Sequence, residues 1–186
     1  VNATGAWAGV VAGLAGADID IIYSKGSLIV THNRITDRVV NRLRPSASAD
    51  ILVPGGTVSI LGTTSIRIDD LDQIYPTVEE VDDMVGEAVK MIPALETVRY
   101  IRAYAGVRPL VGSRSASDDR GVSRSFALID HSADSLENFT TISGGKLTTY
   151  RLMAEKTADL VCRRLGVARP CSTRTEPLGL TQPAKW

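Results

Sequence analysis

The sequence is poor in the residues that mark several large classes of protein. Two cysteines, Cys162 and Cys171, are too few for a disulfide framework or a metal-ligand set, and only two histidines accompany them. No run of 18 or more apolar residues occurs, so no stretch has the length and hydrophobicity of a membrane-spanning helix. Lysine plus arginine equals aspartate plus glutamate at 21 each, so no net charge attracts nucleic acid. We therefore predict no metal site, no transmembrane segment and no nucleic-acid partner.

Common nucleotide-binding and catalytic signatures are also absent. The sequence contains no G-x-G-x-x-G, no Walker loop, no H-E-x-x-H and no internal repeat. Its first residues, Val-Asn-Ala-Thr-Gly, include no initiator methionine and no signal-peptide pattern, and they are typical of a buried strand that runs into a turn. We therefore expect the chain to be part of a longer protein.

The best-marked stretch predicts a strand, a glycine turn and a helix. Residues 139–142 are β-branched or aromatic, Gly144 and Gly145 interrupt them, and the apolar spacing is helical from Leu147 to Leu165. A glycine just after the last periodic residue and a proline beyond it mark the end of the helix. Both ends of this helix are therefore defined by the sequence.

The start of this helix is a candidate anion site. Backbone N–H groups at a helix N-terminus have no intrahelical acceptor, and the helix dipole places partial positive charge there. Two glycines let a ligand approach closely, Lys146 adds a full charge, and Thr148 and Thr149 add hydroxyl donors. From the residues alone, an ordinary glycine turn with a solvated lysine is an equally good interpretation.

The rest of the chain is predicted to be mostly strands, with one further well-marked helix. Residues 21–30 predict a strand that is interrupted at Gly26, and residues 36–49 predict a loop. Residues 77–92 predict a helix, because Thr77 and Glu80 form a capping box before an apolar stripe. Further elements are predicted at residues 1–17 (strand end, turn and apolar helix), 50–53 and 57–61 (a hairpin), 62–69, 99–110, 126–130 and 139–142.

Three segments resemble one family of flavoproteins. Ser-Gly-Gly-Lys-Leu-Thr-Thr-Tyr-Arg-Leu-Met-Ala-Glu, from residue 143, is similar to the flavin-contacting segment of FAD-dependent glycerol-3-phosphate dehydrogenases, members of the D-amino-acid oxidase-like superfamily. Together with Arg-Pro-Cys-Ser-Thr at residues 169–173, it most resembles the large (A) subunit of the anaerobic type. Asn-Ala-Thr-Gly-x-Trp at residues 2–7 is similar to the segment that leaves the FAD domain in these proteins. The resemblance covers nearly the whole chain.

The resemblance implies an α+β fold. An antiparallel or mixed sheet with flanking helices would form a substrate-binding domain, and returning strands and a C-terminal helix would complete an FAD-binding, Rossmann-like domain. We expect residues 1–20 to be the exit strand and helix of the FAD domain, and residues 21–111 to be the substrate-binding (cap) domain. Residues 112–166 would return to the FAD domain, and residues 167–186 would lead toward a further C-terminal segment. The dinucleotide-binding part of such a protein would precede this chain.

The resemblance also implies which residues bind ligands. Arg108, in Val-Arg-Pro-Leu, and Arg124, in Ser-Arg, match arginines at the substrate site of these dehydrogenases. Two planar guanidinium groups from different strands can clamp a phosphate dianion, although a surface ion pair is the commoner role for a single arginine. The implied cofactor-binding residues are Thr4, Gly5, Gly144, Gly145, Lys146, Leu147 and Thr148.

The catalytic base is not assigned. Oxidation of a secondary alcohol requires a base to take the hydroxyl proton. Some aerobic members of the family carry histidine in the segment that matches residues 26–29, but the matching position here is Leu28. His32 and His131 lie near predicted strand ends, where a lone histidine is more often a packing or surface residue than a base.

The resemblance implies that the complete protein oxidises glycerol 3-phosphate to dihydroxyacetone phosphate by hydride transfer to FAD and passes electrons toward quinone. It also implies a cytoplasmic protein held peripherally on the inner face of the cell membrane by other subunits of a dehydrogenase complex. One alternative is a related flavoprotein that oxidises an amino or hydroxy acid, in which one arginine would hold a carboxylate. Another is a catalytically inert structural module. We expect these 186 residues alone to be inactive and to bind FAD weakly or not at all.

Overall fold

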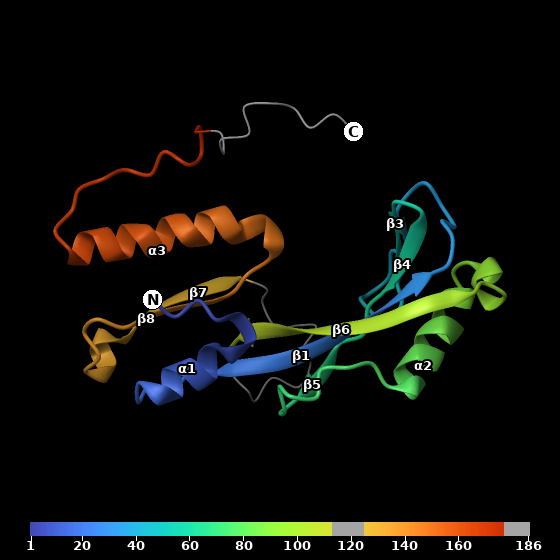
Figure 1. Ribbon diagram of the computed structural model, residues 1–186, viewed down its shortest axis with the longest axis horizontal. Coiled ribbons are helices and arrows are strands. Elements are labelled where there is room, and N and C mark those ends of the chain that lie inside the picture. Colours follow the sequence, from blue (N-terminus) through green and yellow to red (C-terminus); the bar gives the residue numbers. More distant parts are fainter. Residues whose placement is uncertain (113–124, 177–186) are drawn as a thin grey trace.

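The computed structural model describes residues 1–112 and 125–176, and an antiparallel sheet of six strands organises most of it (Figure 1). The central strand is β1, which pairs with β6 along one edge and with β5 and then β4 along the other. β3 and β2 extend the sheet beyond β4. The strands are β1 (Ile21–Thr31), β2 (Val40–Asn41), β3 (Ile51–Gly55), β4 (Val58–Gly62), β5 (Ile66–Ile68) and β6 (Tyr100–Val111).

The interruption predicted at Gly26 is wrong. β1 runs unbroken through this residue, which pairs with Gly106 in β6. The ladder uses only backbone groups, so two opposed glycines do not interrupt it. They leave one position of the sheet without side chains of its own, and the Arg108 guanidinium fills the space where a Gly26 Cβ would lie.

The hairpin predicted around Pro54 is confirmed. β3 and β4 pair antiparallel, and Gly55 lies opposite Val58. Gly56, in the turn between them, has a φ of +66°, which favours glycine. The polar stretch before the hairpin is mostly loop, as predicted, and contributes only the two-residue strand β2.

Helix α2 (Val78–Val89) confirms the capping box, and it covers one face of the sheet. Met84 and Ala88 are fully buried in a core with Leu61 of β4. The acidic side chains on its outer side are exposed or paired with basic residues, and no described group of histidine, cysteine or acidic residues could hold a metal ion. Glu80 is the exception, because its side chain is buried against β1.

A second, smaller sheet lies beside the N-terminal segment of the chain. β7 (Phe126–Asp130) and β8 (Thr140–Gly144) correspond to the two strands predicted there, and they pair antiparallel. α3 (Tyr150–Arg164) lies along β7, and the N-terminal segment forms a parallel bridge to β8 through Asn2 (Figure 1).

α1 (Ala8–Leu14) packs beside this second sheet, and the residues that it buries are not its largest apolar ones. Ala8 and Ala12 are fully buried, whereas Val10 and Leu14 are exposed. The small residues of this helix therefore make its close contacts, and the larger ones form an outer apolar face.

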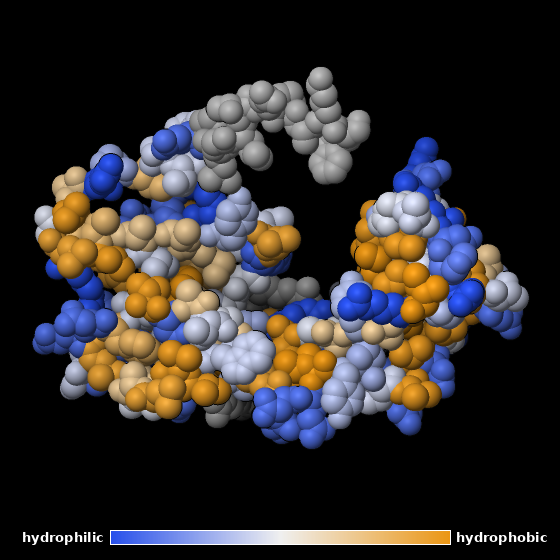
Figure 2. Space-filling view, in the orientation of Figure 1, coloured by the Kyte–Doolittle hydropathy of each residue, from blue (hydrophilic) through white to orange (hydrophobic). Residues whose placement is uncertain are grey.

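The surface is hollowed between the part that carries α3 and the part that carries β3 and β4, on the side of the large sheet away from α2 (Figure 2). Within the described ranges, none of the helices combines the length and the hydrophobicity needed to cross a bilayer.

Candidate functional site

Arg108 is held on one face of the large sheet. It lies on β6 opposite Ser24, and its guanidinium covers Gly26. Its Nη2 donates to the hydroxyl of Thr63 at 2.9 Å, and its Nη1 donates to the carbonyl of Thr64 at 3.3 Å. Both threonines belong to the short Gly-Thr-Thr segment between β4 and β5. This segment and the glycine together fix the position of a planar cation.

A buried network anchors the same segment from within the sheet. Ser27 N–H donates to the Thr64 hydroxyl, and the Ser27 hydroxyl donates to Glu80, each at 2.8 Å. Lys25 Nζ lies 2.8 Å from Glu80 Oε1, and the two side chains are only 7% and 8% exposed. This ion pair was missed because the sequence shows Glu80 only as a helix cap.

The ionisation of Glu80 is set by two opposing effects. Burial disfavours the carboxylate, but hydrogen bonds from Lys25, Ser27 and the Thr77 backbone outweigh it and hold the pKa of Glu80 below its usual range. The carboxylate is therefore charged at neutral pH and ties α2 to β1.

The glycine turn after β8 admits no other residue without a change in structure. Gly144 and Gly145 have φ values of +80° and +77°, in the left-handed region. An added Cβ at Gly144 would lie 2.7 Å from the Ser125 carbonyl oxygen, and one at Gly145 would lie 2.7 Å from Met153 Sδ. Both positive φ and close packing therefore require glycine here.

The helix after this turn begins with one 3-10 turn, η4 (Leu147–Thr149), before α3. Gly145 N–H donates to Ser125, and Lys146 N–H donates to the Thr149 hydroxyl, so these two amides are already bonded. Leu147 and Thr148 open the helical segment, where an amide has no acceptor one turn earlier. The expectation of available backbone N–H groups therefore applies to Leu147 and Thr148, next to the exposed side chain of Lys146.

The other predicted cofactor residues come from the start of the chain and lie beside β8. Asn2 N–H donates to the Thr140 carbonyl at 2.7 Å, and Ile142 N–H donates to the Asn2 carbonyl at 2.9 Å. The Thr4 hydroxyl donates to the Asn2 side chain at 2.7 Å, and Gly5 follows with a φ of +62°. The fold thus brings together two segments that are far apart in the sequence.

These surroundings fit a flavin. Two glycines leave a cradle that any Cβ would fill, and a lysine stands exposed at its rim. The buried hydroxyl of Ser143, directly before the turn, has no hydrogen-bond partner within the described part of the chain. The donor set suits the anionic edge of a reduced flavin, which gains negative charge.

Neither histidine is placed to act as a base. His131 is fully buried, with ring nitrogens 2.9 Å from Asp134 Oδ2 and from the Thr141 hydroxyl, and its ring packs on Phe139. It is a packing residue of the second sheet. His32 is exposed just after β1, so the catalytic base stays unassigned.

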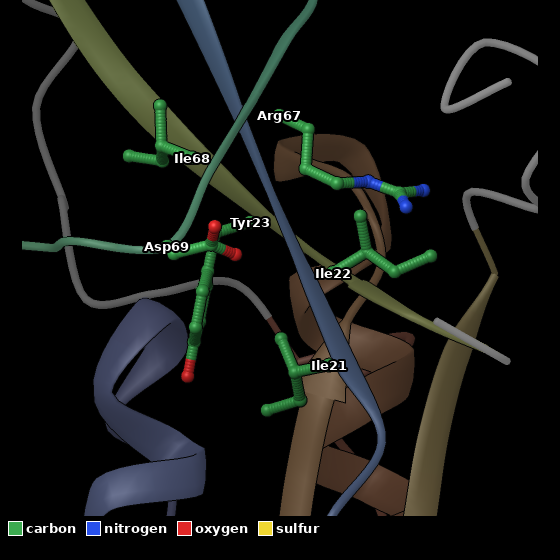
Figure 3. A pocket seen from close by; sticks show the side chains of 6 residues that line it. All are labelled: Ile21, Ile22, Tyr23, Arg67, Ile68 and Asp69. Carbon is green, nitrogen blue, oxygen red and sulfur yellow. The ribbon is translucent and has the colours of Figure 1, made fainter. Parts of the chain in front are cut away.

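A pocket of about 340 Å³ lies at the edge formed by β1 and β5 (Figure 3). It is lined by Ile21, Ile22, Tyr23, Arg67, Ile68 and Asp69. Arg67 and Ile22 extend to one side of β1, whereas Tyr23 and Ile68 extend to the other. Neither Arg108 nor the predicted cofactor turn lines this pocket, and the second predicted arginine, Arg124, lies outside the described residues.

A model of one protein family, described as FAD dependent oxidoreductase, matches residues 1–160. The chain is 48% identical to the A subunit of the anaerobic glycerol-3-phosphate dehydrogenase of Escherichia coli, over all of this chain and 35% of that protein. It is 44% identical to the A1 subunit of the anaerobic enzyme from Haloferax volcanii, over 96% of this chain and 31% of that protein. The chain thus spans about a third of the length of these curated relatives.

Solved structures agree with this relationship. The glycerol-3-phosphate dehydrogenase of Bacillus halodurans, solved as a complex with FAD, superimposes with a TM-score of 0.64 at 28% identity, over 92% of this chain and 33% of that one. A glycine oxidase from Bacillus cereus shares the fold, with a TM-score of 0.60 at 13% identity, over 94% of this chain and 44% of that one. The α+β fold class and the FAD cofactor that the resemblance implied are therefore confirmed, and the chain belongs to the family of FAD-dependent oxidoreductases.

Proposed function

We propose that the complete protein oxidises glycerol 3-phosphate to dihydroxyacetone phosphate with FAD as the hydride acceptor. The observation that carries this proposal is Arg108, a guanidinium fixed against Gly26 by Thr63 and Thr64. A planar cation fixed in this way suits a phosphate group, because it can donate two parallel hydrogen bonds. The names of the relatives support the same substrate.

In this proposal the chain binds and orients the substrate. Arg108 holds the phosphate, and Arg124, which follows β6 in the sequence, adds a second guanidinium. Two guanidinium groups bound to one phosphate dianion fix the distance of the substrate carbons from the sheet. A hydride transfer needs this positioning. FAD, when bound, supplies the two-electron acceptor.

The glycine turn and the segment beside it hold the flavin in this proposal. Thr4 and Gly5 approach from the N-terminal side, and Gly144 and Gly145 let the ring approach the backbone. Lys146, with the amides of Leu147 and Thr148, places positive charge at the N1–C2=O edge.

The domain boundaries stated above are part of this proposal. Residues 21–111 make the large sheet that presents the substrate arginine, and residues 1–20 and 112–166 include the described segments that form the second sheet. We also propose that the protein works with other subunits at the inner face of the cell membrane and passes electrons toward quinone. The names of the relatives, which describe them as subunits, support the assembly.

The substrate is tested by reducing the flavin. The full-length protein, loaded with FAD and kept under argon, is mixed with glycerol 3-phosphate, lactate or an amino acid while the flavin absorbance is followed. We expect bleaching by glycerol 3-phosphate alone, slowed by inorganic phosphate. Bleaching by lactate or an amino acid that phosphate does not slow would instead favour a flavoprotein whose arginine holds a carboxylate.

A further inference from the structure

A second arginine shares the face of the sheet on which Arg108 lies. Ser24 of β1 has two register partners, Arg67 in β5 and Arg108 in β6. Residues directly opposite each other in neighbouring strands project their side chains to the same face. Arg67 and Arg108 therefore emerge on the face of Ser24, one on each side of it.

The close-up view agrees with this assignment. Arg67 extends to the same side of β1 as Ile22 (Figure 3). Ile22 and Ser24 are two positions apart along β1, so they share a face. The opposite face carries Lys25, whose ammonium group pairs with Glu80 of α2. The two arginines are thus on the side away from the buried ion pair.

Ser24, which lies between the two arginines in the register, has a small side chain. Ser24 is fully buried, and its hydroxyl lies 2.9 Å from that of Ser65. Neighbouring strands are about 4.8 Å apart, so the backbones of the two arginines, two strands apart, are separated by roughly 10 Å. An arginine side chain is long enough for the Arg67 guanidinium to approach an anion that the Arg108 guanidinium holds over Gly26.

A phosphate suits two guanidinium groups that share one face. Each group is planar and can donate two parallel hydrogen bonds to phosphate oxygens. The Arg108 side of this arrangement is already fixed by Thr63 and Thr64.

We propose that Arg67 is a further phosphate-binding residue, in addition to Arg108 and Arg124, and that it contacts the phosphate of the substrate from β5 while Arg108 contacts it from β6. This inference rests on the proposed function, and it adds a residue to the same site. It also gives Arg67 a role in substrate choice, because a guanidinium pair discriminates a dianionic phosphate from the single charge of a carboxylate.

The test compares Arg67→Gln with Arg102→Gln in the FAD-loaded, full-length protein. Arg102 is a matched control, because it is also an exposed arginine on the same face of the sheet. Its register partner in β1 is Val30, six residues beyond Ser24, so it lies away from the proposed site. We expect Arg67→Gln to raise KM for glycerol 3-phosphate about tenfold and to weaken inhibition by inorganic phosphate to a similar extent. The control should change both by less than about twofold.

A second variant separates binding from folding. Arg67→Lys keeps the charge but loses the planar fork, so its KM should lie between those of the wild type and Arg67→Gln. Oxidation of glycerol, which has no phosphate, should be unchanged in both variants.

The outcomes separate this inference from the proposed function. If Arg67→Gln behaves like the Arg102 control while Arg108→Lys raises KM, Arg67 is not a ligand and the proposed function stands. If glycerol 3-phosphate fails to reduce the flavin of the wild type, the proposed function is wrong, and the role of Arg67 is wrong with it. A loss of glycerol and glycerol 3-phosphate turnover in equal proportion would also overturn the role of Arg67.

Discussion

At the scale of single residues, Gly26 shows how a glycine can leave space for a side chain that is distant in the sequence. The sequence marks the residue as unusual, because an isolated glycine in a strand often indicates a bulge or a close approach. The structure shows the close approach, and the approaching group is Arg108. The sequence could not identify that partner, because the pairing of Gly26 with Gly106 is a long-range contact.

The first prediction is that Gly26→Ala weakens substrate binding more than it weakens the fold. The added methyl would overlap the end of the Arg108 side chain, which can move aside, so the guanidinium leaves its position but the strand remains. We expect KM for glycerol 3-phosphate to rise about tenfold, equivalent to about 1.4 kcal/mol. Steady-state kinetics of the full-length enzyme measures this.

Gly106→Ala is the matched control, because it is the cross-strand partner and an added Cβ there has no neighbour within 4 Å among the described residues. Its KM should stay close to that of the wild type. Equal changes in the two variants would mean that the guanidinium position over Gly26 has no role in binding.

The second prediction concerns the glycine turn. A Cβ at Gly144 meets both an unfavourable φ and the Ser125 carbonyl, whereas Gly166, after α3, has a φ of +67° and an open surrounding. The strained φ alone costs roughly 1–2 kcal/mol. Denaturant unfolding of the full-length protein should show Gly144→Ala to be less stable than Gly166→Ala by at least about 1 kcal/mol, with a loss of bound FAD. Comparable stability and FAD content in the two would argue against a tightly packed cofactor turn.

At the scale of elements, features set by neighbouring residues were predicted from the sequence. Contacts between residues far apart in the chain were not, because no local pattern encodes them. The capping box of Thr77 and Glu80 and the hairpin at Gly56 depend on neighbours within four residues, and both are confirmed. The pairing of Lys25 with Glu80 depends on how α2 packs on β1, which no local pattern encodes. In the same way, α1 was recognised as a helix, but its buried face consists of alanines.

The third prediction tests this packing through pH. The folded protein lowers the pKa of Glu80, so the carboxylate stabilises the fold at pH values above its unfolded pKa of about 4.3. That contribution disappears as the pH falls through the lower, folded value. Glu80→Gln should therefore cost about 3 kcal/mol at neutral pH, and the difference from the wild type should shrink as the pH falls below about 4.

Urea unfolding of the full-length protein at a series of pH values measures this difference. Asp82→Asn, at an exposed position of the same helix, is the control and should change stability by less than about 0.5 kcal/mol. A stability difference for Glu80→Gln that does not vary with pH would show that the charge of Glu80 does not fasten α2.

At the scale of the whole molecule, the described chain contains two sheets, to which our proposal gives separate roles. The large sheet presents Arg108 on the face away from α2, and the second sheet joins the two segments that we propose contact the flavin. Both sets of residues were proposed from the resemblance in sequence, because it rests on short motifs. It did not predict Arg67 or the buried network, which follow from register and packing. Because the chain spans about a third of its curated relatives, these tests belong in the complete protein.

The central claim is that Arg108 holds the phosphate of the substrate, and Arg108→Lys tests it most directly. Lysine keeps the charge but loses the fork, so we expect a loss of about 1.5–3 kcal/mol, or roughly tenfold to a hundredfold in KM for glycerol 3-phosphate. Turnover of glycerol should be unaffected. Arg102→Lys, on the same strand, should change the KM for neither glycerol nor glycerol 3-phosphate. An equal loss for glycerol and glycerol 3-phosphate would contradict the claim, because the arginine would then act on the fold or the flavin and not on the phosphate.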